Sequence, residues 1–315
     1  MTATTTHRLE GLEPDNLLAF LALLGLLRAL EAVGWRPRVH WAGLPLRPVL
    51  NLREAATPEQ VAEKAAEGCA TLTLDHDFGD EKDMTFDGAR ARELLEAACT
   101  PEASGCSALL GSLFSEAALK DDGRILPSPL CAMFGQGHQH FLTRLADVPR
   151  GVLPKAMAKR RPLPNLNAPI YLKAALFEPW LRIDETDGFR WDPAENRRYA
   201  MRFKNPSGDA GRTVHGANRL ASLGLAALPG AAVVRRRGMR FLTLGAELGP
   251  DGTLGISWPI WSRPASLAAI QAMLAHPGLV SGDAQGMRYL GVVERRRVRR
   301  VANGKFMNFT RAEVV

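Results

Sequence analysis

The pattern of hydrophobic and polar residues predicts one long buried helix near the start of the chain. Residues 17–27 are apolar nearly all round, Asp15 or Asn16 can cap the free N–H groups at the helix start, and Gly34 can end it. The run has 11 residues, well short of the ~20 that cross a bilayer, and acidic residues precede it. We therefore expect a core helix and no membrane segment.

The remaining pattern predicts further helices mainly in the first half and strands mainly in the second. Helical spacing occurs at 57–67, 87–99, 106–120, 138–146, 215–227 and 265–274. Strand signals occur at 38–41, 71–74, 180–183, 199–203, 231–234, 239–244, 254–258 and 287–301. These elements predict an α+β fold, with a helix-rich N-terminal half and an antiparallel-strand-rich C-terminal half that ends in a basic hairpin.

Residues 149–169 interrupt the periodic pattern. They contain five prolines and five cations, and prolines at this density exclude regular structure. The stretch is a domain boundary, a surface loop along something acidic, or both. We predict an acidic, helix-rich domain at 1–148, a Pro-rich basic linker at 149–169 and a basic α+β domain at 170–315.

Charge changes sign at the same place. Residues 1–150 contain 14 Lys and Arg against 21 Asp and Glu, whereas residues 151–315 contain 26 against 12. Of the 40 basic residues 32 are arginine, whose guanidinium group binds phosphate oxygens in pairs. A surface with this much positive charge attracts polyanions, so the composition favours nucleic acid as the partner.

The most basic stretch, 294–309, contains Asn303-Gly304 between two strand-like runs. An Asn-Gly pair favours a type I′ turn, and as a two-residue loop it places Ala302 opposite Lys305. Side chains alternate along a strand, so one face is expected to pack on a core while the other presents arginines. The arginine face would carry Arg295, Arg297 and Arg299, and the other face Val298, Met307 and Phe309 with Arg296 and Arg300 among them.

Arginines at alternate strand positions repeat about every 6.6 Å, close to the phosphate step of a nucleic-acid strand. The alternative is a solvated edge strand whose charges block aggregation, but this does not require five arginines in six positions. A second basic turn at 235–237 and the basic linker add to the charge, although a basic turn alone is often only solvated. The predicted nucleic-acid-binding residues are Arg295, Arg297, Arg299, Arg300, Lys305, Arg235, Arg236, Arg237, Lys159, Arg160 and Arg161.

Three stretches resemble proteins encoded in type I-G (formerly I-U) CRISPR-Cas loci. They are LEGLEPDNLLAFLALLGLLR at 9–28, FGQGHQHF at 134–141, and FRWDPAENRRYA at 189–200 with HGANRL after it at 215–220. The resemblance implies a subunit of a CRISPR interference complex, either related to its large subunit or an accessory piece, that works beside other effector subunits in antiviral defence. In such complexes base pairing supplies sequence specificity and the protein supplies charge and shape.

Two alternatives remain open. The first is a metal-dependent nuclease, because a predicted strand is followed by Asp75, His76, Asp77 and Asp80, and carboxylates at a strand end can hold Mg²⁺ or Mn²⁺. A solvated acidic loop would have the same sequence pattern. The arginines could also bind an acidic protein. GxxxxGK[ST], GxSxG and HExxH patterns are absent from the sequence, so it gives no support to ATPase, serine hydrolase or zincin activity.

The four cysteines lack the spacing of a zinc site or a disulfide framework, so we expect reduced, buried thiols in a cytoplasmic protein. The sequence therefore predicts a non-enzymatic nucleic-acid-binding subunit of a type I CRISPR complex, with no cofactor. Whether the ligand is RNA, DNA or a hybrid is left open.

Overall fold

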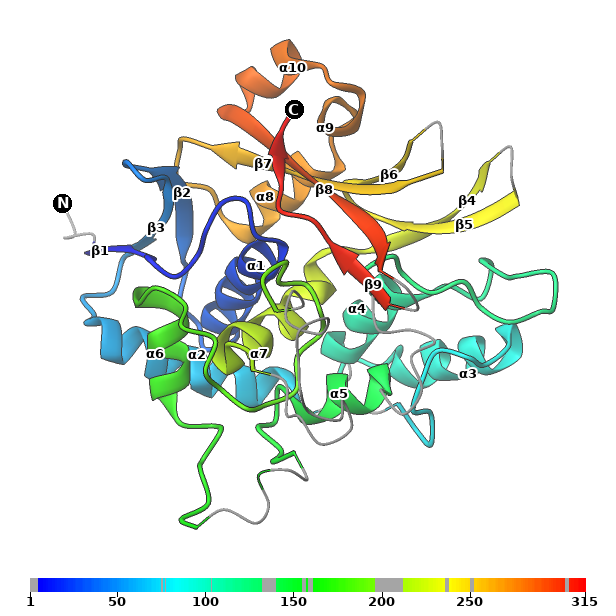
Figure 1. Ribbon diagram of the computed structural model, residues 1–315, viewed down its shortest axis with the longest axis horizontal. Helices are drawn as coiled ribbons and strands as arrows, with labels where there is room; N and C mark the ends of the chain where they lie inside the picture. Colours follow the sequence, from blue (N-terminus) through cyan, green and yellow to red (C-terminus); the bar gives the residue numbers. More distant parts are fainter. Residues whose placement is uncertain are drawn as a thin grey trace.

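The structure is a computed structural model of the 315-residue chain (Figure 1). It describes residues 5–74, 76, 78–102, 104–131, 140–154, 157, 161–195, 212–235, 238–249, 252–303 and 306–315, without the side chains of 104, 302, 303 and 306.

Helix α1 (Leu17–Ala32) runs through the centre of the molecule (Figure 1). It begins as predicted: the side-chain oxygen of Asn16 accepts a hydrogen bond from the backbone N–H of Leu18 at 3.0 Å. Gly34 follows the helix with φ 82°, a left-handed conformation that glycine adopts without steric cost. Thirteen of the sixteen helical residues are buried, which confirms the predicted core helix.

Helix α7 (His215–Gly224) crosses α1 at a contact between the two backbones. A Cβ atom added to Gly25 would lie 1.8 Å from the carbonyl oxygen of Leu220, and one added to Gly224 would lie 2.1 Å from that of Leu21. Only glycine allows this approach. The contact therefore holds a helix from the acidic half of the chain directly against a helix from the basic half.

Helix α2 (Pro58–Leu72) packs against α1 through a third glycine, because a Cβ atom on Gly68 would lie 1.9 Å from the carbonyl oxygen of Ala29. A capping box starts α2: the Thr57 N–H donates to Gln60 Oε1 at 2.8 Å, and the Gln60 N–H donates to Thr57 Oγ1 at 3.3 Å. The helical layer also contains α3 (Gly88–Ala98), α4 (Ser104–Leu113), α5 (Phe141–Asp147) and α6 (Pro169–Phe177).

The strands form antiparallel sheets. Strands β1 (Thr5–Arg8), β2 (Arg38–Ala42) and β3 (Arg47–Leu52) pair in the order β1-β3-β2. Strands β4 (Gly230–Arg235) and β5 (Gly238–Thr243) form a separate hairpin. The largest sheet has the order β10-β8-β7-β6 with β9 paired to β8, and its strands are β6 (Ala246–Leu248), β7 (Leu254–Trp261), β8 (Val292–Asn303), β9 (Phe306–Phe309) and β10 (Glu313–Val314).

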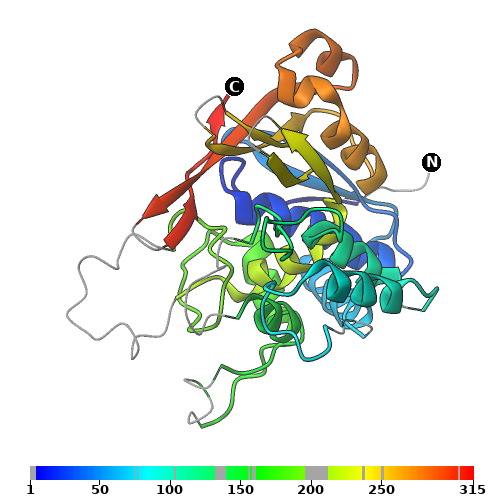
Figure 2. The same ribbon diagram turned by 90° about the vertical axis from the view of Figure 1, so that its right-hand side faces the viewer.

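The 3₁₀ helix η3 (Leu225–Ala227) connects α7 to β4, and three helices lie between β7 and β8: α8 (Leu267–Ala275), α9 (Pro277–Ser281) and α10 (Ala284–Tyr289). In the view turned by 90°, the C-terminal strands lie above the helical layer (Figure 2). Helices predominate in the first half of the chain and strands in the second, so the predicted α+β class is confirmed.

Strand β7 connects the largest sheet to the core. Trp258 stacks on Phe20 of α1 with ring centroids 5.2 Å apart, and the indole N–H of Trp261 donates to the carbonyl oxygen of Val39 in β2 at 2.6 Å. The buried hydrophobic residues form one cluster that includes residues on both sides of 149–169. The acidic and basic segments therefore share a core.

Two predicted strands are wrong. Residues 71–72 end α2, and the Thr73 hydroxyl donates to the carbonyl oxygen of Cys69 at 3.0 Å, which continues the helical pattern. Residues 180–183 are not a strand because Arg182 has φ 54°, outside the extended region. Beside it, Asp184 makes an isolated bridge with Thr213.

Several boundaries also differ from the prediction. Helix α4 ends at Leu113 rather than at 120, and β8 begins at Val292 because the preceding residues form α10. Strands β1 and β3 have no counterpart in the prediction. The predicted strand at 199–203 lies outside the described residues.

None of the four cysteines, all of which lie in the described segments, forms a disulfide; Cys69, Cys106 and Cys131 are buried as expected. Cys99 is exposed, contrary to the expectation, because it follows the last residue of α3 at the protein surface. Within the described segments, no helix combines the length and apolarity needed to cross a membrane.

Substituting Gly25 with alanine should lower the free energy of unfolding by about 3 kcal/mol or more, since the added methyl group overlaps the α7 backbone. Gly111→Ala is the matched control, because it lies within helix α4 and an added Cβ meets no atom within 4 Å. We expect it to be neutral or to stabilise by up to about 1 kcal/mol. Urea unfolding measures both, and equal effects would contradict the α1–α7 contact.

Candidate nucleic-acid interface

The structure describes six of the eleven predicted nucleic-acid-binding residues. Lys159, Arg160, Arg236, Arg237 and Lys305 lie outside the described residues. Arg161 is exposed in the loop before α6, and Arg235 is exposed at the end of β4, opposite Gly238. The other four, Arg295, Arg297, Arg299 and Arg300, all lie on β8.

The β8–β9 hairpin forms, but the predicted register is wrong. Asn303 pairs with Phe306, so residues 304–305 connect the strands instead of Asn303-Gly304. The same register continues one residue beyond β9: the Thr310 N–H donates to the Arg299 carbonyl oxygen at 3.0 Å, and the Arg299 N–H donates to Thr310 Oγ1 at 3.1 Å. Each strand keeps its predicted faces, because opposing residues change by two positions and side chains alternate.

Arg297 is held by a carboxylate of the same sheet. Its Nη2 lies 2.6 Å from Glu247 Oε1 on β6, so the side chain crosses β7 to reach its partner. It crosses above Gly255, where an added Cβ atom would lie 2.8 Å from Arg297 Nε. The positive charge of Arg297 is therefore balanced within the protein.

The other residues of the arginine row also have protein partners. Arg299 Nη2 lies 3.2 Å from Glu313 Oε2 on β10, and both side chains are exposed. Arg295 Nη1 donates to the carbonyl oxygen of Leu279 at 2.8 Å. The predicted row lies on one sheet face, but these contacts leave it less free to bind phosphate than the sequence suggests.

Arg300 lies on the opposite face of β8 and is half-buried. Its Nη1 donates to the carbonyl oxygen of Pro129 at 3.3 Å, and no carboxylate among the described residues forms an ion pair with it. Burial lowers the pKa of this guanidinium, but arginine still remains charged at neutral pH. A desolvated cation of this kind interacts strongly with an anion that reaches it.

Arg300 lines a cleft of about 390 Å³ together with Lys120 and Arg240. These three cations come from the segment after α4, from β5 and from β8, and we call this site the cationic cleft. Apolar side chains, including Phe241 and Met307, form much of the remaining wall. Among the described residues, no Asp or Glu lines it.

Cys131 also lines the cationic cleft. Burial raises the pKa of its thiol, so the thiol stays neutral and adds no negative charge. The charges on the described lining residues are therefore those of the three cations, while Asp122, which does not line the cleft, interacts with Lys120. The arrangement suits a phosphate group with an apolar neighbour such as a nucleobase.

Sequence reasoning identified only one of the three cleft cations as a binding residue. Arg240 follows the basic turn at 235–237 but was not among the predicted binding residues. Lys120 is next to Asp121 and Asp122 in an acidic stretch, so the local sequence does not indicate a phosphate contact there. The three residues are far apart along the chain, and only the tertiary structure brings them together.

The predicted nuclease cluster gains no support from the residues that can be placed. Asp75 and Asp77 lie outside the described residues, His76 is buried, and Asp80 is exposed. Across the described segments, no three His, Cys, Asp or Glu residues are grouped so that they could hold a metal ion.

Comparison with known proteins found no family model and no curated protein that matches this chain. The resemblance to type I-G CRISPR proteins therefore stays a prediction from the sequence.

Replacing Glu247 with glutamine should lower the free energy of unfolding by about 1–3 kcal/mol, because Arg297 would lose its charged partner in a partly buried position. Glu313→Gln is the control, since the Arg299–Glu313 pair is exposed and should contribute less than about 0.5 kcal/mol. Urea unfolding of the two variants measures the difference. Equal losses would show that the Arg297–Glu247 pair contributes no more to the free energy of unfolding than an exposed ion pair does.

Proposed function

We propose that this chain binds the sugar-phosphate backbone of a nucleic acid at the cationic cleft, as a non-enzymatic subunit of a type I CRISPR interference complex in the cytoplasm. The observation that carries the binding proposal is the convergence of Lys120, Arg240 and Arg300 with no carboxylate among the described lining residues. The resemblance described above supports the assignment to a CRISPR complex and to partner effector subunits.

Charge supports a polyanion as the ligand. The chain has a net charge of +7, and the excess of basic residues is concentrated after residue 150. Backbone contacts of this kind do not read sequence, which suits a subunit of a complex whose guide RNA supplies the specificity. The arginine row on β8 is a second, weaker contact, because the Arg297 and Arg299 ion pairs must open before these side chains bind phosphate.

The test is the salt dependence of binding to fluorescein-labelled oligonucleotides about 20 nucleotides long, single-stranded and duplex. Each lost phosphate contact lowers the slope of log affinity against log salt by about 0.7 on a single strand and about 0.9 on a duplex. We expect the combined substitutions Lys120→Gln, Arg240→Gln and Arg300→Gln to weaken binding and to reduce the slope by about two to three units.

Two further variants make the result specific. Arg36→Gln, Arg38→Gln and Arg53→Gln together remove the same charge from exposed positions around β2 and β3, outside the cationic cleft, and should change the slope by less than about half a unit. Because Arg300 is half-buried and its loss could perturb folding, the Lys120→Gln, Arg240→Gln double variant is tested as well, and its slope should fall by the amount expected for about two lost contacts.

Equal changes of slope in the cleft and control variants would mean that binding depends only on the net charge of the protein, which would contradict the proposal. Displacement of the oligonucleotide by polyglutamate at the same charge concentration would favour an acidic protein partner instead.

A further inference from the structure

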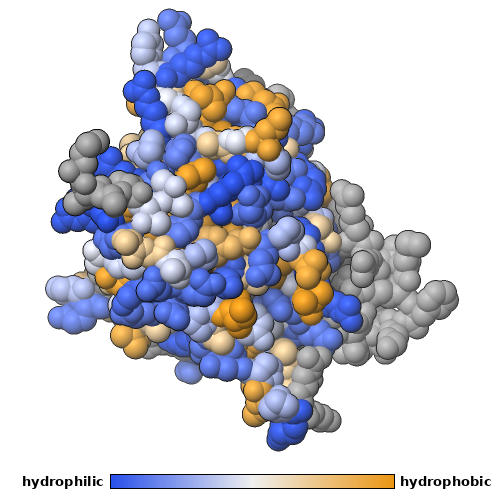
Figure 3. Space-filling view, turned by 90° about the vertical axis from the view of Figure 1, so that its left-hand side faces the viewer, coloured by the Kyte–Doolittle hydropathy of each residue, from blue (hydrophilic) through white to orange (hydrophobic). Residues whose placement is uncertain are grey.

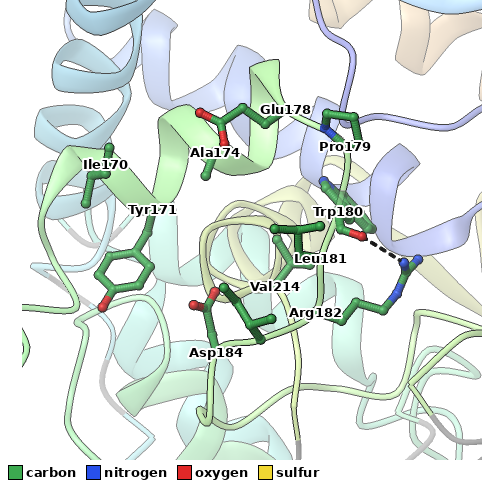
Figure 4. A pocket seen from close by; sticks show the side chains of 11 residues that line it. Ile170, Tyr171, Ala174, Glu178, Pro179, Trp180, Leu181, Arg182, Asp184 and Val214 are labelled. Atoms are coloured by element: carbon green, nitrogen blue, oxygen red, sulfur yellow. Dashed lines mark hydrogen bonds between the residues drawn. The ribbon is translucent and has the colours of Figure 1, made fainter.

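A second pocket, of about 300 Å³, lies beside α6 and shares no lining residue with the cationic cleft. Figure 4 shows Tyr171 and Asp184 on one side of it, Trp180 and Arg182 on the other, and Leu181 and Val214 between them. The pocket is therefore apolar at its centre and polar at its edges.

Three of the lining hydrophobic side chains are unusually exposed. Ile170 is 59% exposed, Leu181 75% and Ile183 63%. The surface on the α6 side is mostly hydrophilic and is interrupted by separate hydrophobic patches (Figure 3). Large apolar side chains gathered around a hollow are typical of a binding surface, whereas single scattered ones are not.

Asp184 gives the pocket a negative group. Its Oδ2 accepts the backbone N–H of His215 at 2.8 Å, at the start of α7, and no described residue donates to its Oδ1 or forms an ion pair with it. Burial raises the pKa of this carboxyl group, because the single hydrogen bond does not offset the loss of water. A cation placed in the pocket would relieve this cost.

Arg182, the one cation among the described lining residues, does not neutralise Asp184. Arg182 is committed to the buried carboxylate of Asp192, through Nε at 2.7 Å and Nη2 at 3.3 Å. Asp192 is held in turn by Asn16 Nδ2 at 3.1 Å. Glu178 is exposed at the rim, so the pocket has a net negative charge.

We propose that this pocket binds a basic side chain, Arg or Lys, presented between apolar residues by a partner polypeptide. The charge complements Asp184, whereas the exposed Glu178 is screened by water and contributes little. The aliphatic stem of the side chain fits the apolar centre, and the flanking residues cover Ile170, Leu181 and Ile183. Phosphate is excluded as an occupant by the carboxylates. The inference is independent of nucleic-acid binding, since it concerns other residues.

The test uses two blocked tripeptides, acetyl-Leu-Arg-Leu-amide and acetyl-Leu-Gln-Leu-amide, titrated to about 10 mM against the full chain by ligand-observed NMR. We expect the arginine peptide to bind at least about fivefold tighter than the glutamine peptide. Asp184→Asn keeps an acceptor for the His215 N–H and should abolish this difference. Asp121→Asn, an exposed carboxylate outside the pocket, is the control and should leave the difference unchanged.

Leu181→Ser measures the apolar contribution to peptide affinity separately from the contribution of charge. Because Leu181 is largely exposed, the substitution should not impair folding. It should weaken both peptides equally. Equal affinity of the two peptides, a preference that survives Asp184→Asn, or no binding over the whole titration would overturn the proposal.

Discussion

Helices α1 and α7 touch backbone to backbone, because Gly25 lies against the carbonyl of Leu220 and Gly224 against that of Leu21. This contact fixes the distance between the N-terminal helices and the segment that leads into β4. The sheet behind that segment then stacks Trp258 on α1. The strands that supply Arg240 and Arg300 are thus placed relative to Lys120 by a core that both halves of the chain share.

The arginines of β8 have different surroundings on the two faces of the strand. On one face of β8, Arg297 and Arg299 meet carboxylates of neighbouring strands, so their charges are balanced within the sheet. On the other face, Arg300 enters a hollow that no described carboxylate lines. A row of arginines in a sequence therefore does not distinguish structural from ligand-facing cations, because the difference depends on which acidic side chains lie across the sheet.

Local signals in the sequence were sufficient for part of the fold. Asn16 and Gly34 mark the ends of α1, Thr57 begins α2, and alternation gives the faces of β8. The predicted register of β8 and β9 is wrong by two positions, because pairing along the whole hairpin, up to Arg299 with Thr310, outweighs the preference of Asn-Gly for the turn. The cationic cleft could not be predicted from the sequence, because three segments far apart in the chain form it and no local pattern indicates that they come together.

Crosslinking mapped by mass spectrometry tests the central claim directly. Oligonucleotides carrying 5-iodouracil, irradiated with the full chain, should label peptides that line the cationic cleft, around Lys120, Pro129, Arg240 and Met307. Labels confined to β2 and β3, or spread evenly over all exposed basic residues, would contradict binding at the cleft.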